Sequence, residues 1–402
     1  MTRRWELDAL RGLMLVLMTF THLPTRLAEP LGQPLGFVSA AEGFVMLSGY
    51  MAGIVYTLRA RRDGLPRMQD AFVRRASTVY ACQVALLAFL FSAIVVLDRF
   101  TDQKAIANVG SFFQADPVVA VLSAALLLYN PPLLDILPMY VLFLLASPML
   151  LSTGLRGGWT RIVAGSLALW LGAQFGLGGW LYGQAVALTG LPVPPEQTGA
   201  FSILAWQFLW VLGLWMGATS VTRTDPPRRF PRALVAAATV WAAVCLGWRH
   251  AVGLDPSTVA MAPVNLLFDK WQLGPLRLLD FLALLLLAMH HARWLKRHVP
   301  RLRFLEVFGA ASLTVFCVHL VAVLVALAAF GEARPARPWW TDAVVLAGAF
   351  GAMQLAARLQ LALIARRRSA PSATARSPRR SGAARPAGTA PDAVAPQDPA
   401  SR

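Results

Sequence analysis

Long, continuous apolar runs separated by short basic segments dominate the chain. Ten of these runs have the length of about 17 to 25 residues that a helix needs to cross a bilayer. The pattern therefore predicts an all-α, polytopic integral membrane protein with about ten transmembrane helices. Because the runs do not alternate between apolar and polar residues, they exclude a membrane barrel. The ten predicted spans are 9–27, 36–58, 76–97, 136–154, 160–178, 200–220, 233–249, 277–293, 306–329 and 340–364.

The placement of basic residues predicts the orientation of these spans. A further apolar stretch, Val118–Tyr129, is about 12 residues long, which is short for a crossing and favours an interfacial or re-entrant segment. Ten crossings then place both termini on one side of the membrane. Arginine and lysine are enriched in cytoplasmic loops, so we expect both termini to be cytoplasmic. The basic loops on that side are 59–75, 156–161, 221–232 and 293–303.

Composition agrees with this class and argues against a nucleic-acid partner. The chain is 57% hydrophobic and only 14% charged, whereas soluble domains average about 25% charged residues. The net charge of +17 is accounted for by the basic loops and a basic tail, which favour contact with membrane lipids. Residues 366–402 are rich in Arg, Ser, Pro and Ala and carry too little apolar surface to fold. We therefore expect a transmembrane domain over 1–365 and a disordered basic cytoplasmic tail over 366–402.

Neither the cysteines nor any known short motif points to a metal or a tightly bound cofactor. Cys82, Cys245 and Cys317 each stand alone in an apolar segment, without disulfide or zinc spacing. The start of the chain has the two arginines of a signal peptide. Charged residues interrupt its apolar region and no clear cleavage site follows, so we expect the first helix to be retained.

Four ionisable residues in the first two spans are the main candidates for function: Asp8, Arg11, His22 and Glu42. Such groups are costly at membrane depth and usually face a partner or a cavity. Arg11 and His22 are eleven residues apart, about three helical turns or roughly 16 Å, and therefore share one face of a helix. Asp8 lies one turn before Arg11. A plain alternative is that Asp8 and Arg11 neutralise each other at the surface and His22 is a polar cap.

The second span supplies the acidic member of this group. The connection between the first two spans is short, so the helices are expected to be antiparallel neighbours, with Glu42 within reach of His22. The second span also carries Ser48 and the pattern Gly49-x-x-x-Gly53, which permits close helix packing.

Two outer segments and one later span hold the remaining candidates. Asn130 and Asp135 flank a proline-rich entry that is expected either to line a cavity or to be capped by Asp135. Lys270, Trp271 and Arg277 suit a sugar ligand, although Arg277 and Asp280, one turn apart, could simply pair. His319, in the middle of a span, is a weaker candidate because a lone helical histidine is commonly a packing residue.

Four segments of the chain resemble the OpgC family, whose members are similar to the broader acyltransferase-3-type membrane enzymes. They are ELDALRGLMLVLMTFTH, GFVSAAEGFVMLSGYMAG, DILPMYVLFLLASP and FDKWQLGPLRLLDFLAL, in colinear order over roughly residues 3 to 330. The resemblance implies transfer of an acyl group, typically succinyl, from cytosolic acyl-CoA to glucose residues of periplasmic glucans at the bacterial inner membrane. The superfamily's Arg and His, separated by ten residues, correspond to Arg11 and His22. Glu42 matches the family's acidic position.

The resemblance and the residues together suggest roles. Arg11, with Asp8, would bind the phosphates of the donor acyl-CoA, and His22 would act as general base. Glu42 would orient His22 or bind acceptor hydroxyls, and both direct transfer and an acyl-histidine intermediate fit. The main alternative is a proton-coupled transporter with a relay through these groups; another is acylation of a different surface glycan. The acceptor-binding candidates are Asn130, Asp135, Lys270, Trp271 and Arg277, with His319 and Ser48 as additional site residues.

Overall fold

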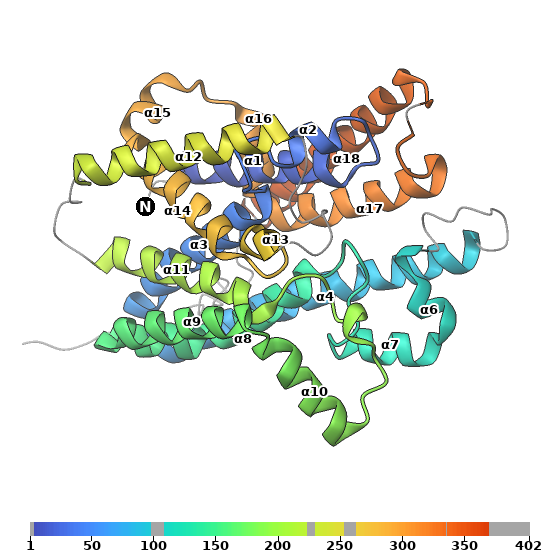
Figure 1. Ribbon diagram of the computed structural model, residues 1–402, viewed down its shortest axis with the longest axis horizontal. Coiled ribbons are helices and arrows are strands. Elements are labelled where there is room, and N and C mark those ends of the chain that lie inside the picture. Colours follow the sequence, from blue (N-terminus) through green and yellow to red (C-terminus); the bar gives the residue numbers. More distant parts are fainter. Residues whose placement is uncertain (1–3, 98–107, 223–229, 253–262, 335, 370–402) are drawn as a thin grey trace, which may run out of the picture. The chain divides into compact units, whose positions relative to one another are not determined.

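The computed structural model describes residues 4–97, 108–222, 230–252, 263–334 and 336–369, and these residues form helices without a β-strand (Figure 1). The predicted all-α class is confirmed. The α-helices are α1 (Trp5–His22), α2 (Ala28–Gly32), α3 (Ala40–Asp63), α4 (Leu65–Leu97), α6 (Ser111–Ala115), α7 (Pro117–Ala125), α8 (Ile136–Thr153), α9 (Trp159–Gln174), α10 (Leu177–Thr189), α11 (Ile203–Thr222), α12 (Arg232–Val252), α13 (Pro263–Phe268), α14 (Pro275–His290), α15 (Ala292–His298), α16 (Arg303–Ala310), α17 (Ser312–Phe330) and α18 (Trp339–Ser369). A π-helical segment, Gly154–Gly158, joins α8 to α9, and a 3-10 turn covers Pro195–Gln197.

The chain forms two compact units, Met1–Leu361 and Ala362–Arg402. The described part of the second unit is the end of α18. Most of the expected tail, residues 370–402, lies outside the described residues, so the domain boundary at 365 stays a prediction. All further description concerns the first unit.

Each of the ten predicted spans falls on one or more helices. Fewer than ten single helices, however, are long and apolar enough to cross a membrane. Among the described residues, seven helices are long and apolar enough to cross a membrane, or eight if the bent pair of α14 and α15 is one span. Helix α1 fails because Glu6, Asp8 and Arg11 lie within its 18 residues. Helices α8 and α9 count together as one run of 39 residues. The chain is therefore a helical membrane protein, and the number of ten crossings remains a prediction.

The 39-residue run folds back on itself at Gly157. This glycine has a φ of +94°, inside the π-helical segment, and glycine adopts that conformation without the strain that a side chain would cause. On one side of it, Ser147 Oγ accepts a hydrogen bond from Trp210 Nε1 (2.9 Å). On the other side, Ser166 Oγ donates to Gln207 Oε1 (2.6 Å). Both partners belong to the same turn of α11, so α8 and α9 must be two antiparallel helices.

The helix boundaries correct one predicted loop. The basic segment 59–75 is helical apart from Gly64, because α3 continues to Asp63 and α4 starts at Leu65. The 33 residues of α4 span about 50 Å, more than the hydrocarbon core of about 30 Å, so part of this helix extends beyond it. Helix α7 begins one residue before the predicted non-crossing stretch Val118–Tyr129, and its nine residues cover only about 13 Å.

The ends of several helices place two of the basic segments at the same end of the unit. In Figure 1 the N-terminal end of α1, the end of α11, the start of α12 and helix α15 all lie at the left of the picture. Helices α6 and α7 lie at the right. The basic residues of α15 thus share one end of the unit with the helix ends that border the predicted basic loop 221–232.

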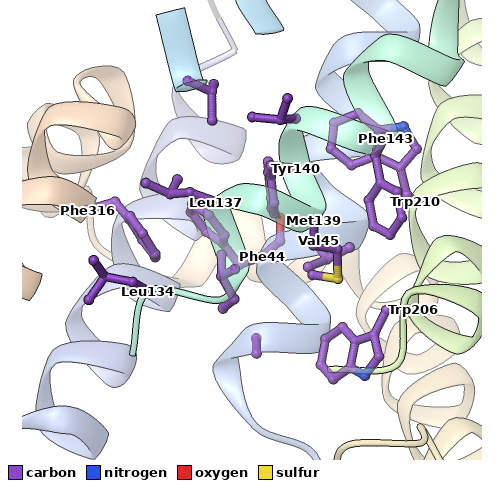
Figure 2. Packing of buried hydrophobic residues seen from close by; sticks show 14 of the residues in the cluster. Phe44, Val45, Leu134, Leu137, Met139, Tyr140, Phe143, Trp206, Trp210 and Phe316 are labelled. Atoms are coloured by element: carbon purple, nitrogen blue, oxygen red, sulfur yellow. Dashed lines mark hydrogen bonds between the residues drawn. The ribbon is translucent and has the colours of Figure 1, made fainter. Parts of the chain in front are cut away.

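Helices α3 and α11 pack through facing glycines. A Cβ atom built on Gly49 would lie 2.5 Å from the Trp210 carbonyl oxygen, and Gly53, Gly213 and Gly217 are equally confined by backbone atoms of the opposite helix. Aromatic side chains pack beside this contact, as Figure 2 shows. Tyr140 donates a hydrogen bond to the Phe44 carbonyl oxygen (3.1 Å). The expected small-residue packing of Gly49 and Gly53 is therefore made with α11.

This contact predicts that an added methyl group at Gly49 destabilises the fold. Gly49→Ala should lower the free energy of unfolding by about 1–3 kcal/mol, the usual cost of overpacking. Gly348→Ala is the matched control, since a Cβ atom there meets nothing within 4 Å. Thermal unfolding of the purified variants in detergent measures both effects. Equal melting temperatures for the two variants would show that α3 and α11 are not in close backbone contact.

Candidate active site

Two polar contacts connect α1 to α17. Arg11 Nη2 donates a hydrogen bond to Ser312 Oγ (2.5 Å), and His22 Nδ1 lies 3.2 Å from His319 Nε2. Arg11 precedes His22 as Ser312 precedes His319, so the two helices run in the same direction. Both ends of the predicted Arg11–His22 face are therefore matched by polar residues of α17, which are almost 300 positions away in the sequence.

The two histidines form a buried pair. Their rings are nearly parallel, with an interplanar angle of 18° and centroids 5.5 Å apart. His319 is fully buried, and its Nδ1 lies 2.5 Å from the Phe316 carbonyl oxygen. His22, at the end of α1, is partly buried. His319, the weaker candidate from the sequence, is thus the residue that the structure brings against His22.

A cavity of about 220 Å³ is lined by residues of α1, α3, α4, α8, α11 and α17. Along α3 it extends from Phe44 to Tyr56, a separation of twelve residues or about 18 Å of helix. Phe316 lines the cavity and also contacts the ring of His319, with centroids 4.9 Å apart. Phe316 therefore lies between the cavity and the ring of His319, and neither histidine is among the residues that line the cavity. The lining residues that matter below are Arg11, Ser48, Tyr56, Arg75, Tyr140, Ser312 and Phe316.

Two arginines give the cavity a positive charge, and only one of them was identified from the sequence. Arg11 was expected there. Arg75, which the sequence placed in a loop, lies eleven residues into α4 and is exposed. Arg75 was not identified as a site residue because the apolar run of the third predicted span begins only after it. Ser48, the further candidate on α3, lines the same cavity.

Two buried polar side chains next to lining residues have no hydrogen-bond partner among the described residues. Thr57 follows Tyr56 on α3, and Gln83 lies one turn beyond Val79 on α4; both are fully buried. An unsatisfied buried amide costs free energy. Neither Thr57 nor Gln83 is among the residues that line the cavity.

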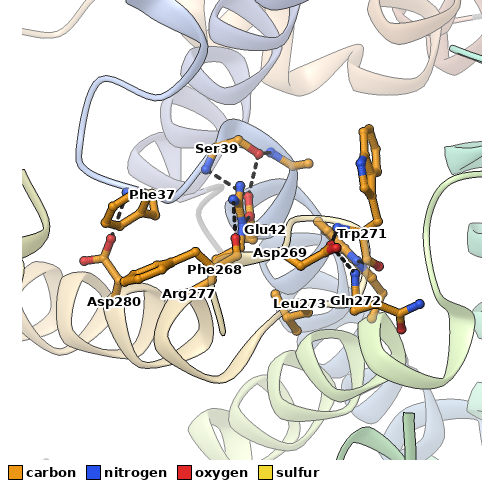
Figure 3. Close-up of polar contacts among 12 residues, drawn as sticks. Phe37, Ser39, Glu42, Phe268, Asp269, Trp271, Gln272, Leu273, Arg277 and Asp280 are labelled. Carbon is orange, nitrogen blue, oxygen red and sulfur yellow. Dashed lines mark hydrogen bonds and ion pairs between the residues drawn. The ribbon is translucent and has the colours of Figure 1, made fainter. Parts of the chain in front are cut away.

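Glu42 lies in an ion pair with Arg277, not beside His22. Arg277 Nε is 2.5 Å from Glu42 Oε1, and both side chains are fully buried. The other carboxylate oxygen accepts hydrogen bonds from the Ser39 backbone N–H (3.0 Å) and from the Ser39 hydroxyl (2.6 Å). Figure 3 shows Glu42 between Ser39 and Arg277. The expected contact with His22 fails because the start of α3 and a buried cation use both oxygens of this carboxylate.

Arg277 and Asp280 stabilise the turn before α3 rather than each other. Arg277 pairs with Glu42 and donates from Nη1 to the Phe268 carbonyl oxygen (3.4 Å). Asp280 Oδ2 accepts from the Phe37 backbone N–H (3.1 Å). Arg277 was expected to bind acceptor from the outer surface, and its complete burial places it inside the bundle instead.

The other acceptor candidates lie on residues 130–135 and 270–271, and both of these segments contact residues 198–202. Asn130 donates from Nδ2 to the Thr198 carbonyl oxygen (2.7 Å), and Asp135 Oδ2 accepts from the Ala200 N–H (3.1 Å). Asp135 is the N-cap residue of α8, but its side chain makes no capping hydrogen bond to that helix.

The backbone of Trp271 holds its segment against residues 202–206. Its carbonyl oxygen accepts from the Ser202 N–H (3.0 Å) and from Trp206 Nε1 (3.1 Å). The Trp271 side chain itself is 40% exposed, and Lys270 Nζ lies 4.9 Å from its ring centroid. An exposed indole and a nearby carboxylate, Asp135, therefore belong to linked segments.

Asp8 faces a different space from Arg11. It is buried and lines a second cavity of about 730 Å³ with Trp5, Arg301 and Glu306. Arg301 lies over the Trp5 ring at 4.7 Å and pairs with Glu306 at 2.8 Å. The two residues of the predicted donor pair thus line separate cavities.

The Glu42–Arg277 pair predicts a characteristic pattern of stability. Arg277→Met leaves a buried carboxylate without its cation and should cost about 3–5 kcal/mol, whereas removing both charges restores most of that loss. We expect the double variant Arg277→Met/Glu42→Met to fall short of the native protein by about 1 kcal/mol, since the cap of α3 is lost. Thermal unfolding measures both. A double variant no more stable than the single one would contradict the pairing.

Comparison with known proteins gives one match. No curated protein and no solved structure matches the chain. The family model described as OpgC protein matches residues 3–363, which include α1, the cavity, the histidine pair and the outer segments. The chain therefore belongs to the OpgC family.

Proposed function

We propose that this protein is a multi-pass O-acyltransferase of the bacterial inner membrane that moves a succinyl group from cytosolic acyl-CoA to a hydroxyl of a periplasmic glucan. The observation that carries the proposal is the cavity lined by Arg11, Arg75 and Phe316, because Phe316 also contacts the ring of His319, the partner of His22. Membership of the OpgC family supports a glucan-modifying acyltransferase. The proposal includes ten crossings with both termini in the cytoplasm.

The two substrates are separated by the bilayer, and this determines what the protein must do. Acyl-CoA is too polar to cross, and a glucan is too large to enter a helical bundle. The reacting groups must therefore meet within the protein. Support for the orientation comes from the basic segments that share one end of the unit (Figure 1) and from the general enrichment of basic residues on the cytoplasmic side.

On the donor side, Arg75 and Arg11 bind the negatively charged groups of acyl-CoA. A guanidinium makes two parallel, charge-assisted hydrogen bonds to phosphate or carboxylate oxygens. A cavity that follows α3 over about 18 Å suits the linear arm of the donor.

On the acceptor side, the exposed Trp271 ring stacks on a sugar, and Asp135 and Asn130 accept hydrogen bonds from its hydroxyls. Lys270, close to the Trp271 ring, adds a donor. Arg277 and Glu42 take no part in this binding, since each is buried in the pair that joins α3 to α14. Their role is to hold the bundle together.

His22 is the general base at the point where the two sides meet. Its ring takes the proton of the attacking hydroxyl, the hydroxyl oxygen bonds to the thioester carbon, and the bond from carbon to sulfur breaks. The proton then passes to the CoA thiolate that leaves. The same position also fits a two-step route through an acyl-histidine intermediate. In this route the ring of His22 first takes the acyl group from the thioester and then passes it to the sugar hydroxyl, with water excluded.

Mass spectrometry of periplasmic glucans tests this function. A strain that carries the gene should contain glucans with an added succinyl mass, and a strain without the gene should not. Complementation with His22→Gln, which keeps the size of the side chain but cannot take a proton, should lower the acylated fraction by about 10²–10⁴-fold. His290→Gln, at an exposed position, is the control and should restore acylation. Unmodified glucans in every strain would contradict the acceptor, and proton-driven flux without acylation would favour the transporter.

Arg11→Lys tests the donor side. The substitution keeps the charge but loses the planar pair of donors, so we expect the dissociation constant for acyl-CoA to rise about tenfold or more, which is about 1.4 kcal/mol. The melting temperature should change little, because an ammonium can still bond Ser312. Binding of acyl-CoA to the purified variants by calorimetry measures the effect. Unaltered affinity would return Arg11 to a purely structural role.

A further inference from the structure

We propose that His319 is a positioning residue that holds the proton of His22 on Nδ1 and so leaves Nε2 of His22 as its only basic nitrogen. The inference rests on the proposed function in so far as His22 is the base. The arrangement of protons itself follows from the geometry and can be tested without any activity.

The proton positions follow from one carbonyl group. The Phe316 carbonyl oxygen can only accept, so the 2.5 Å contact with His319 Nδ1 requires the proton of His319 on Nδ1. In a neutral ring Nε2 is then an acceptor. Its neighbour at 3.2 Å is His22 Nδ1, which must therefore carry the proton of His22. The lone pair of His22 is left on Nε2.

The orientation of the two rings favours a hydrogen bond rather than face-to-face packing. The ring planes differ by only 18°, and the centroids are 5.5 Å apart while the nearest nitrogens are 3.2 Å apart. The centroid separation exceeds the nitrogen separation by about the sum of two ring radii. The rings therefore lie almost end to end in one plane, which aims the N–H of His22 along the lone pair of His319.

The surroundings make this arrangement a fixed one. His319 is fully buried, with an exposed fraction of 0%, so its ring nitrogens depend on protein partners. Phe316 and His319 are three residues apart on α17, which keeps the carbonyl and the ring together as long as the helix is intact. A histidine's active tautomer is commonly set in this way, by the hydrogen bond that its other nitrogen makes.

The consequence for the reaction is a defined proton path. Nε2 of His22 takes the proton of the sugar hydroxyl and the ring becomes a cation. Its Nδ1–H stays bonded to His319 Nε2, which stabilises the charge. The same proton leaves from Nε2 to the CoA sulfur. His319 neither gains nor loses a proton during transfer.

Nitrogen NMR of the protein in lipid nanodiscs, labelled with ¹⁵N-histidine, tests the assignment directly. The chain has only six histidines, and the spectra of His22→Gln and His319→Gln assign the two signals of interest. We expect the Nδ1–H form for His22 and for His319 at neutral pH. In His319→Leu, which offers no acceptor, His22 should shift toward the Nε2–H form. His22 in the Nε2–H form in the native protein would overturn the proposal.

Acyl transfer by the same variants tests the consequence. His319→Leu should lower kcat by about 100-fold or more, as expected for a base in the wrong tautomer, with unchanged donor affinity. His319→Gln places an amide oxygen near the position of Nε2 and should keep kcat within about tenfold of the native value. Normal turnover in His319→Leu, or equal loss in both variants, would overturn the positioning role.

These outcomes are separate from those of the proposed function. If the native protein transfers no acyl group, the proposed function fails while the NMR result still decides the tautomer. His290→Leu, at an exposed position on α14, is the control for loss of a histidine and should leave both readouts unchanged.

Discussion

A titratable or charged side chain inside an apolar helical bundle must find its partner within the protein, because neither lipid nor water is there to solvate it. In this protein three such partnerships determine how the helices are placed. Glu42 and Arg277 join α3 to α14, and Arg11–Ser312 and His22–His319 join α1 to α17. Apolar packing alone would leave the rotation of these helices weakly defined. The polar contacts select one arrangement.

The need for a partner within the protein also distinguishes the groups that stabilise the fold from those that could react. Both oxygens of Glu42 are used, one by the cation and one by the start of α3, so no atom of this carboxylate is left for a substrate. His22 differs, since its contact with His319 uses only one ring nitrogen. The pair thus leaves the second ring nitrogen of His22 without a contact to His319, and this is the nitrogen that we propose as the base. Phe316 links the cavity to His319 through its ring and its carbonyl group.

The features that depend on residues close together in the sequence were predicted correctly. The helix periodicity placed Arg11 and His22 on one face of α1, and the apolar runs fell on helices. The sequence did not predict contacts between residues far apart in the chain: Glu42 and Arg277 are separated by 235 positions and His22 and His319 by 297. One feature of the sequence does indicate the position of Glu42. Ser39 and Glu42 have the spacing of a capping box, which already assigns the carboxylate to the start of a helix. Arg75 was hidden because it lies before the apolar run of its own helix.

In the proposed function, the acyl group passes from one side of the membrane to the other through this cavity. The most direct measurement uses the purified protein in sealed liposomes of uniform orientation, with radiolabelled succinyl-CoA on the side of the α1 N-terminus and glucan on the opposite side. The account predicts labelled glucan in this arrangement and none when both substrates are confined to either one side. Labelled glucan formed only when donor and acceptor share a side would contradict it.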